Sequence, residues 1–416
     1  MGKVMFVPTN WPRHTLAMMV GQKPGHAGAR RRFSQALREW MPKSSTGGHF
    51  DAMDGLRGLA IVLVVITHSF YTNPDGPKFL VYVGALIGTA GFGLTIFFVL
   101  SGFLISLPFF RQRERDKSAW YPPGYAARRA LKIVPPFYLA IVVLALFYYW
   151  RYRDADYFRL GLAWATGVAH IQYLPKFFNT SFWSLWVEIG FYVSLPFLFL
   201  ALKGFNVKTT GWILFAILIL APFVTRQLTS PTGADPGELG FRMRRFPNSL
   251  DSFGWGVLFS SLYVSASPRL AQWRRYACLG YAGLASLALT SLLFMMISLQ
   301  PPSVPVSPRW EIELNHLLPG VSAFLMLFFV FDPACRGARF FSSPGLRFLG
   351  IVSYEWFLFH QPAVVQFREW MVSSHGNLFR YLITVGTPLV CTLGLAILVY
   401  HNFSLPILRW GRDKLG

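Results

Sequence analysis

Residues 54–69 read DGLRGLAIVLVVITHS, an apolar run that could cross a bilayer and that nevertheless carries two polar side chains. Arg57 begins the run, and His68 follows eleven residues later. In an α-helix that spacing amounts to three turns plus about 20° and a rise of about 16 Å, so both residues lie on one face. A lipid-facing span normally excludes such residues. We therefore expect Arg57 near one membrane surface, His68 well inside, and a chemical role for the pair.

The composition is that of a polytopic membrane protein. Of 416 residues, 53% are hydrophobic and only 14% are charged, whereas a soluble domain has about 25% charged residues. The net charge of +21 comes from short basic clusters between apolar runs, which fits membrane topology better than nucleic-acid binding. Cys278, Cys335 and Cys391 are far apart, and their spacing is not that of a metal site.

The apolar runs predict an all-α fold, a polytopic integral membrane helical bundle of about ten transmembrane helices. An eleventh candidate, Leu160 to Leu174, is short for a span and contains His170. The ten runs are Leu56 to Tyr71, Gly84 to Phe110, Ile133 to Trp150, Phe182 to Leu202, Trp212 to Val224, Leu250 to Val264, Ala277 to Leu299, His316 to Phe331, Leu349 to Phe367, and Tyr381 to Leu408.

Loop charge gives these runs a direction. We expect residues 1–49, which are strongly basic, to form a disordered cytoplasmic tail, residues 50–408 to form the membrane domain, and residues 409–416 to form a short cytoplasmic tail. If Leu160 to Leu174 does not cross, two further basic loops and the basic C-terminal tail also face the cytoplasm, so ten crossings with both termini cytoplasmic is the better count. The segment would then be re-entrant or lie on the surface. This topology places Arg242, Arg244 and Arg245 outside, where they could face an anionic acceptor.

Five motifs in order resemble the signatures of the acyltransferase 3 family, the membrane O-acyltransferases that modify bacterial surface polysaccharides, Nod factors, peptidoglycan and some antibiotics. The resemblance covers roughly Phe50 to Phe403 and implies a multi-pass protein of the cell membrane. The motifs are DGLRGLAIVLVVITH at 54–68, FFVLSGFLI at 97–105, RRALKIVPPFY at 128–138, FWSLWVEIGFY at 182–192 and SYEWFLFHQP at 353–362.

The resemblance implies acyl transfer from a cytoplasmic acyl-CoA, most simply acetyl-CoA, to a glycan, lipid or small-molecule acceptor. Arg57 and His68 match the family hallmark of a basic residue, ten intervening positions and a histidine. Guanidinium groups suit the phosphates of CoA, and the topology groups Arg57, Arg128, Arg129 and Lys132 at one mouth. The family usually has an arginine where this chain has Lys132, so we expect Arg128 and Arg129 to be the better phosphate ligands. Simple positive-inside anchoring would also explain the last three residues.

His68 is the first candidate for the catalytic residue, as a base on the acceptor hydroxyl or as a carrier of the acyl group itself. By residue counting, Glu188 and His360 reach a similar depth in the membrane. Glu188 could orient or charge-stabilise an imidazole, as the acid does in a catalytic triad, and His360 could contact the acceptor or the thioester. For all three residues, a structural hydrogen bond between helices is the alternative.

Two other classes of function compete with this prediction. A transporter or flippase of a carbohydrate or lipid also keeps a few charged residues within a helical bundle, although no matching half-sequences are visible. A non-catalytic membrane scaffold would tolerate substitution of Arg57, His68 and Glu188. The chain has no HExxH, Walker or GxSxG motif, so we expect no metal. The acceptor, the acyl length and the oligomeric state are not encoded in any pattern that we can interpret.

Overall fold

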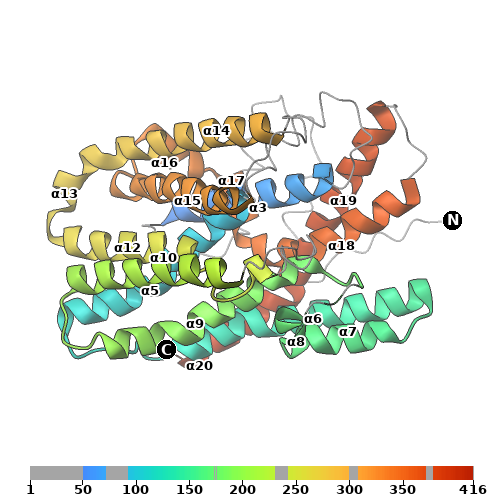
Figure 1. The fold of residues 1–416 in the computed structure, drawn as a ribbon, viewed down its shortest axis with the longest axis horizontal. Helices are drawn as coiled ribbons and strands as arrows, with labels where there is room; N and C mark the ends of the chain where they lie inside the picture. Colours follow the sequence, from blue (N-terminus) through green and yellow to red (C-terminus); the bar gives the residue numbers. More distant parts are fainter. Residues whose placement is uncertain are drawn as a thin grey trace, which may run out of the picture.

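The computed structural model describes residues 50–71, 92–172, 174, 176–229, 242–298, 308–371 and 378–415, and all regular secondary structure there is helical (Figure 1). The predicted tail over residues 1–49 lies outside these ranges. The helices are α3 Asp51–Tyr71, α5 Phe92–Arg115, α6 Tyr125–Tyr152, α7 Asp156–Ala165, α8 Val168–Ile171, α9 Trp183–Ala201, α10 Val207–Thr229, α12 Asp251–Ala266, α13 Leu270–Trp273, α14 Leu279–Ser298, α15 Pro308–Met326, α16 Arg336–Phe341, α17 Pro344–Ile351, α18 Ser353–Met371, α19 Leu378–Val399 and α20 Leu405–Leu415.

The fold is that of a multi-span membrane protein. Among the described residues, seven helical segments are long and apolar enough to cross a bilayer: Asp51–Ser69, Phe92–Arg115, Tyr125–Tyr152, Thr180–Ala201, Val207–Thr229, Ala271–Leu293 and Val385–Lys414. The other three predicted spans are short or interrupted helices. α12 has only 16 residues, His316–Phe331 is a shorter apolar helix, and the run from Leu349 is interrupted between α17 and α18. The class of fold is confirmed, and the count of ten stays a prediction.

The described residues of the segment Leu160 to Leu174 do not form one continuous helix. It is divided between α7 and the four-residue α8, with a break at Gly167, whose φ of 81° is in the left-handed region. A side chain at Gly167 would also approach the Trp186 ring at about 3.0 Å. A surface or re-entrant element fits this broken geometry.

Helix α3 lies at the centre of the molecule and packs against α5, α17 and α18 (Figure 1). Its contact with α17 is a backbone contact, because a Cβ atom on Gly58 would lie 2.1 Å from the Leu346 carbonyl oxygen and one on Gly350 would lie 1.8 Å from that of Asp54. An ion pair of 3.0 Å between Asp51 and Arg347 fixes the same two helices at the start of α3. These contacts hold the face that carries Arg57 and His68 in place.

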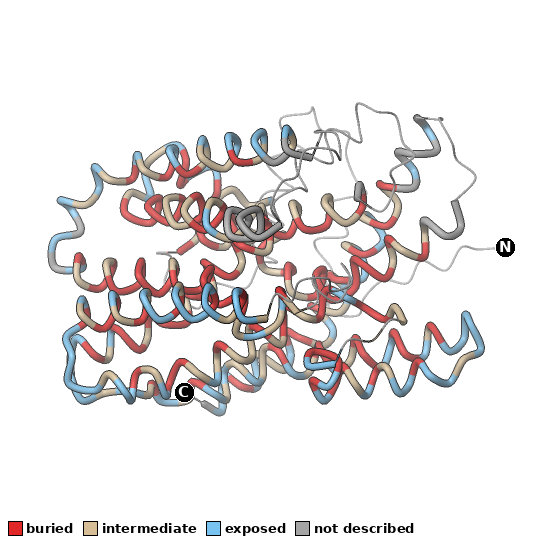
Figure 2. The backbone as a smooth tube through the Cα atoms, in the orientation of Figure 1, coloured by how far each residue is buried: buried red, intermediate tan, exposed pale blue. Residues whose placement is uncertain are grey.

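The apolar core has two parts, and α3 contributes to both. Met53, Leu56 and Ala60 belong to one cluster of buried side chains, whereas Val64 and Val65 belong to the other. Figure 2 shows the buried residues concentrated where the helices face one another. The polar face of α3 therefore lies within a well-packed interior, where its orientation is fixed by packing on both sides.

Candidate active site

His68 and His360 meet in the interior of the bundle. The Nε2 atom of His360 lies 3.4 Å from the Nδ1 atom of His68, and the ring centroids are 4.9 Å apart at 72°. His68 Nδ1 is also 2.8 Å from the Val64 carbonyl oxygen, and His360 Nδ1 is 2.8 Å from that of Phe357. Because a carbonyl only accepts, each bond requires a proton on Nδ1. This assignment leaves a lone pair on each Nε2 atom.

Helix α18 is held against the start of α9 by a buried polar network. The Asn179 side chain donates to the Leu358 carbonyl oxygen at 3.0 Å. The Ser181 amide and hydroxyl both donate to Gln361 Oε1 at 2.8 Å, and the Gln361 amide donates to Thr180 Oγ1 at 2.6 Å. These bonds flank His360 and fix the rotation of its helix.

Glu188 lies away from the two histidines and accepts hydrogen bonds from the hydroxyl groups of Ser101 and Tyr192. Both donate to its Oε1 atom, Ser101 at 2.8 Å and Tyr192 through a short hydrogen bond. Since residues 179–181 bond to α18 beside His360, Glu188 is about 10 Å further along its helix. The expected common depth of Glu188 and the two histidines is therefore wrong. Residue counting assumed that the span with Glu188 starts at the membrane surface. In the structure, α9 begins in the interior of the bundle, beside α18.

Three of the four predicted phosphate ligands, Arg57, Arg129 and Lys132, form one cluster near the start of α3, at the opposite end of its polar face from His68. Lys132 interacts electrostatically with Arg57 and Arg129, which repel its charge, and with Glu188 and Asp54, which attract it. The guanidinium of Arg129 lies 6.0 Å from the centre of the Tyr192 ring. Its buried Nε atom has no hydrogen-bond partner among the described residues. A cation cluster with an unused buried donor is suited to an anionic ligand.

Arg128 points away from this cluster. Its side chain is exposed and donates to the Pro123 carbonyl oxygen at 2.6 Å, in the loop that precedes α6. Helical spacing alone would allow both arginines near Lys132, since they lie four and three residues before it. The hydrogen bond to Pro123 is what directs the Arg128 side chain to the loop instead. The structure puts Lys132 and Arg129 together in the cluster.

The sequence gives Glu355 no role in the site, and it places Arg244 only at an outer surface that could face an anionic acceptor. Glu355 is buried at the start of α18 and interacts electrostatically with Lys132 and Arg57. Arg244, in the segment between α10 and α12, acts electrostatically on His68. Glu355 lay in a quoted motif, but a carboxylate in the first turn of a helix is usually read as favourable to the helix dipole. For Arg244, no local pattern in the sequence indicates that it lies near His68.

The segment that carries Arg244 is itself fixed by buried groups. Arg226 donates to Asp251 at 2.9 Å and to the Asn248 carbonyl oxygen at 2.5 Å. The Asn248 side chain donates to the Arg242 carbonyl oxygen at 2.8 Å, and Ser249 donates to that of Arg244 at 3.1 Å. The arginine-rich segment therefore has a defined conformation at this end of the bundle.

His170 also belongs to this end. Its Nε2 atom accepts a hydrogen bond of 3.0 Å from the Phe246 amide, and Arg245 donates to the Ile171 carbonyl oxygen at 3.0 Å. Burial, with the charge of Arg245, lowers the pKa of His170 to about 4. A neutral ring is what the accepted hydrogen bond requires, so His170 joins α8 to the segment rather than serving as a proton carrier.

These groups define a class of protein: a polytopic helical membrane protein whose central helix α3 carries Arg57, which belongs to a cation cluster, and His68, which meets His360 of α18. Among the described residues, no group of three or more histidine, cysteine or acidic side chains could hold a metal ion. The acyltransferase 3 family model, described as an acyltransferase domain, matches residues 50–401. The chain belongs to this family.

Named relatives agree with the family at low identity. The chain is 25% identical over 377 residues to "Peptidoglycan O-acetyltransferase OatA" of Listeria monocytogenes, covering 86% of this chain and 56% of the relative. It is 24% identical over 339 residues to "Putative membrane-bound transacylase BcsY" of Komagataeibacter xylinus, and the match covers 75% of this chain and 72% of that relative. The chain thus spans about half the length of the first of these relatives. No solved structure matches it.

Proposed function

We propose that this protein transfers an acyl group, most simply acetyl, from acyl-CoA to a hydroxyl group of a carbohydrate. Membership of the acyltransferase family and the relatives' names support an O-acyltransferase. The observation that carries the proposal is that one helix, α3, links the cation cluster at Arg57 to the histidine pair at His68. The rise of about 16 Å between them suits a donor bound by its phosphates at one end with its thioester at the other.

Arg57, Arg129 and Lys132 would bind the phosphates of the donor. Arg129 offers a buried unpartnered N–H and a planar guanidinium, and Lys132 adds a point charge beside it. Glu188 and Asp54 reduce the repulsion within the cluster. Glu188 would therefore position Lys132 and Arg129 at the donor end rather than orient His68. Arg128 would contribute only to the general attraction of anions.

His68 would act as the general base through Nε2. It takes the proton from the acceptor hydroxyl, the hydroxyl oxygen bonds to the thioester carbonyl carbon, and the C–S bond breaks. The thiolate of CoA then receives the proton, so the products are the ester and free CoA. His360 presents its lone pair to the Nδ1–H of His68 and stabilises the imidazolium that forms. Attack by His68 on the thioester, with an acyl-histidine as intermediate, is the second route that this geometry permits.

The acceptor would enter from the opposite membrane surface, near Arg244. Ten crossings with both termini in the cytoplasm place the donor cluster inside the cell and Arg244 outside, in the cell membrane. The electrostatic influence of Arg244 on His68 supports an acceptor that carries negative charge. The relatives' names support a carbohydrate such as peptidoglycan.

The test uses the full chain in lipid nanodiscs with radiolabelled acetyl-CoA and a soluble cell-wall oligosaccharide. We expect acetyl ester to form and CoA to be released in equal amounts, and both to be lost in His68→Ala. Binding of a non-hydrolysable acetyl-CoA analogue separates this function from transport, because a carbohydrate or lipid transporter has no use for that ligand. Failure to bind the analogue, or transfer by His68→Ala at the wild-type rate, would refute the mechanism.

A further inference from the structure

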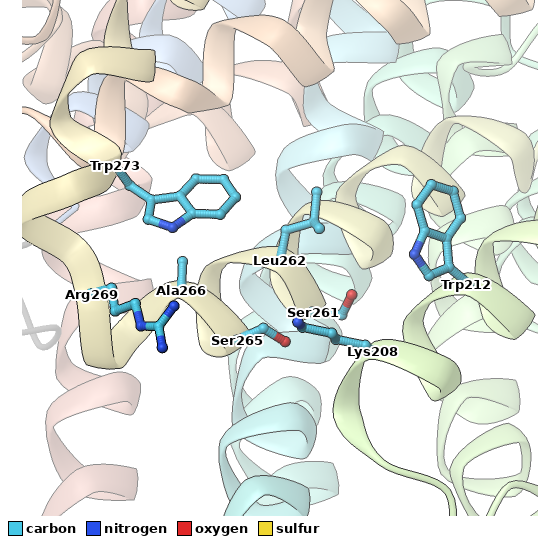
Figure 3. A pocket seen from close by; sticks show the side chains of 8 residues that line it. All are labelled: Lys208, Trp212, Ser261, Leu262, Ser265, Ala266, Arg269 and Trp273. Carbon is cyan, nitrogen blue, oxygen red and sulfur yellow. The ribbon is translucent and has the colours of Figure 1, made fainter.

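A cavity of 540 Å³ opens between the start of α10, the end of α12 and α13 (Figure 3). None of the candidate active-site residues lines it. Its lining combines two cations, two indole rings, a leucine and small polar groups; the residues that matter most are Lys208, Trp212, Leu262, Ser265, Arg269 and Trp273. The catalytic proposal gives this cavity no role.

The cavity lies at a membrane surface. α10 begins at Val207, α12 ends at Ala266, and the two helices pack against each other. The first turn of one and the last turn of the other therefore meet at the same level. In the proposed topology this surface is cytoplasmic, which fits the exposed cations Lys208 and Arg269. A cavity at this level opens into the headgroup region of the bilayer.

The lining is polar on one side and apolar on the other. In Figure 3, Lys208 and Arg269 approach the hydroxyl group of Ser265 from opposite sides, and the indoles lie apart from them. Trp212 is four residues along α10 from Lys208, about 6 Å deeper in the membrane. Its side chain is exposed on the protein surface. From the membrane surface inward, the cavity thus presents cations, then a hydroxyl group, then an apolar ring. A phospholipid presents its phosphate, glycerol and acyl chains in the matching order.

No carboxylate in the described ranges neutralises the two cations. Within the described part of the chain, neither Lys208 nor Arg269 lies within ion-pair distance of a carboxylate. Two unpaired cations that converge on one cavity repel each other, so an anion between them lowers the electrostatic energy. Basic pockets between helices at the membrane surface are suited to anionic lipid headgroups.

We propose that this cavity binds an anionic phospholipid of the adjacent leaflet. The phosphate lies between Lys208 and Arg269 and accepts a hydrogen bond from Ser265. The glycerol and the first acyl carbons lie against Trp212 and Leu262. A soluble phosphate compound would satisfy the cations but not the apolar side of the cavity, so the lipid is the occupant that uses the whole lining.

The test compares lipids by native mass spectrometry on the full-length protein. The probes are phosphatidylglycerol, zwitterionic phosphatidylcholine and glycerol 3-phosphate, which has the charge without the chains. The variant is Lys208→Gln with Arg269→Gln. The control, Lys117→Gln with Arg412→Gln, removes the same charge from exposed positions outside the cavity.

We expect one phosphatidylglycerol to be retained selectively and its affinity to fall by about tenfold or more in the cavity variant, with little change in the control. Each single substitution should produce part of the loss, which keeps the test valid if the double variant folds poorly. Equal retention of phosphatidylcholine, or an unchanged affinity in the cavity variant, would overturn the proposal. Displacement by an equal concentration of glycerol 3-phosphate would also overturn it, because the site would then belong to a soluble phosphate.

Discussion

At the scale of single residues, the histidine pair is asymmetric. His360 is fully buried, whereas His68 is partly exposed. Only His68 can therefore meet a substrate directly, and His360 acts through it. This asymmetry leads to different expectations for the two residues.

Replacing His68 by alanine should reduce acyl transfer by about 100-fold or more, since a general base contributes roughly that factor. His360→Gln should retain measurable transfer and shift the pH profile, because a glutamine oxygen can still accept from His68 Nδ1–H but stabilises the imidazolium differently. Steady-state rates across a pH series measure both effects. His401→Ala, a substitution outside the site, is the control, and equal losses in all three variants would contradict the assignment.

The cation cluster predicts a separate effect on the donor. Arg129→Lys keeps the charge and loses the guanidinium fork, so KM for acetyl-CoA should rise by about tenfold while kcat changes little. Arg128→Lys, one residue earlier, serves as the matched control because its side chain points away from the cluster. A larger effect at Arg128 than at Arg129 would show that the donor lies outside the cluster.

At the scale of elements, the contact between α3 and α17 has no room for side chains. Gly58→Val should therefore separate the helices, lower the thermal stability and reduce activity, because the added Cβ would start 2.1 Å from a backbone oxygen. Gly394→Ala is the control, since nothing lies within 4 Å of a Cβ atom there. The midpoint of heat-induced aggregation in detergent measures the difference, and equal stability of both variants would contradict this packing.

A second element-scale prediction concerns Arg113, in the last turn of α5. Its side chain is 1% exposed and donates to the Phe199 and Leu202 carbonyl oxygens at 2.7 and 2.6 Å, where α9 ends. Arg113→Lys should cost roughly 2 kcal/mol, because the lysine cannot reach both acceptors and leaves one unsatisfied. Arg115→Lys, at an exposed position, should be neutral in the same thermal measurement.

At the scale of the whole molecule, the number of crossings decides where the C-terminus lies. With ten crossings, a green fluorescent protein fused to the C-terminus should fluoresce and alkaline phosphatase at the same place should be inactive. If residues 160–174 crossed, the two reporters would give the opposite result. The broken helices α7 and α8 favour the first outcome.

Cysteine labelling tests the same topology from the loops. In a background without the three native cysteines, Arg245→Cys should react with a membrane-impermeant maleimide in intact cells. A variant that keeps only Cys278, which is exposed, should react only after the membrane is broken. Labelling of Cys278 in intact cells would reverse the proposed orientation.

The sequence by itself determined the membrane class, the helical fold and the pairing of Arg57 with His68 on one helical face. These follow from apolar run length, helical periodicity and motifs, all of which are local along the chain. Only the tertiary structure brought His360 to His68, turned Arg128 away from the cluster of Arg57, Arg129 and Lys132, and moved Glu188 about 10 Å from its expected depth. Depth counted from a loop assumes that every span starts at the surface. The start of α9 is instead fixed by hydrogen bonds to α18 in the interior, and contacts between distant segments leave no local signal in the sequence.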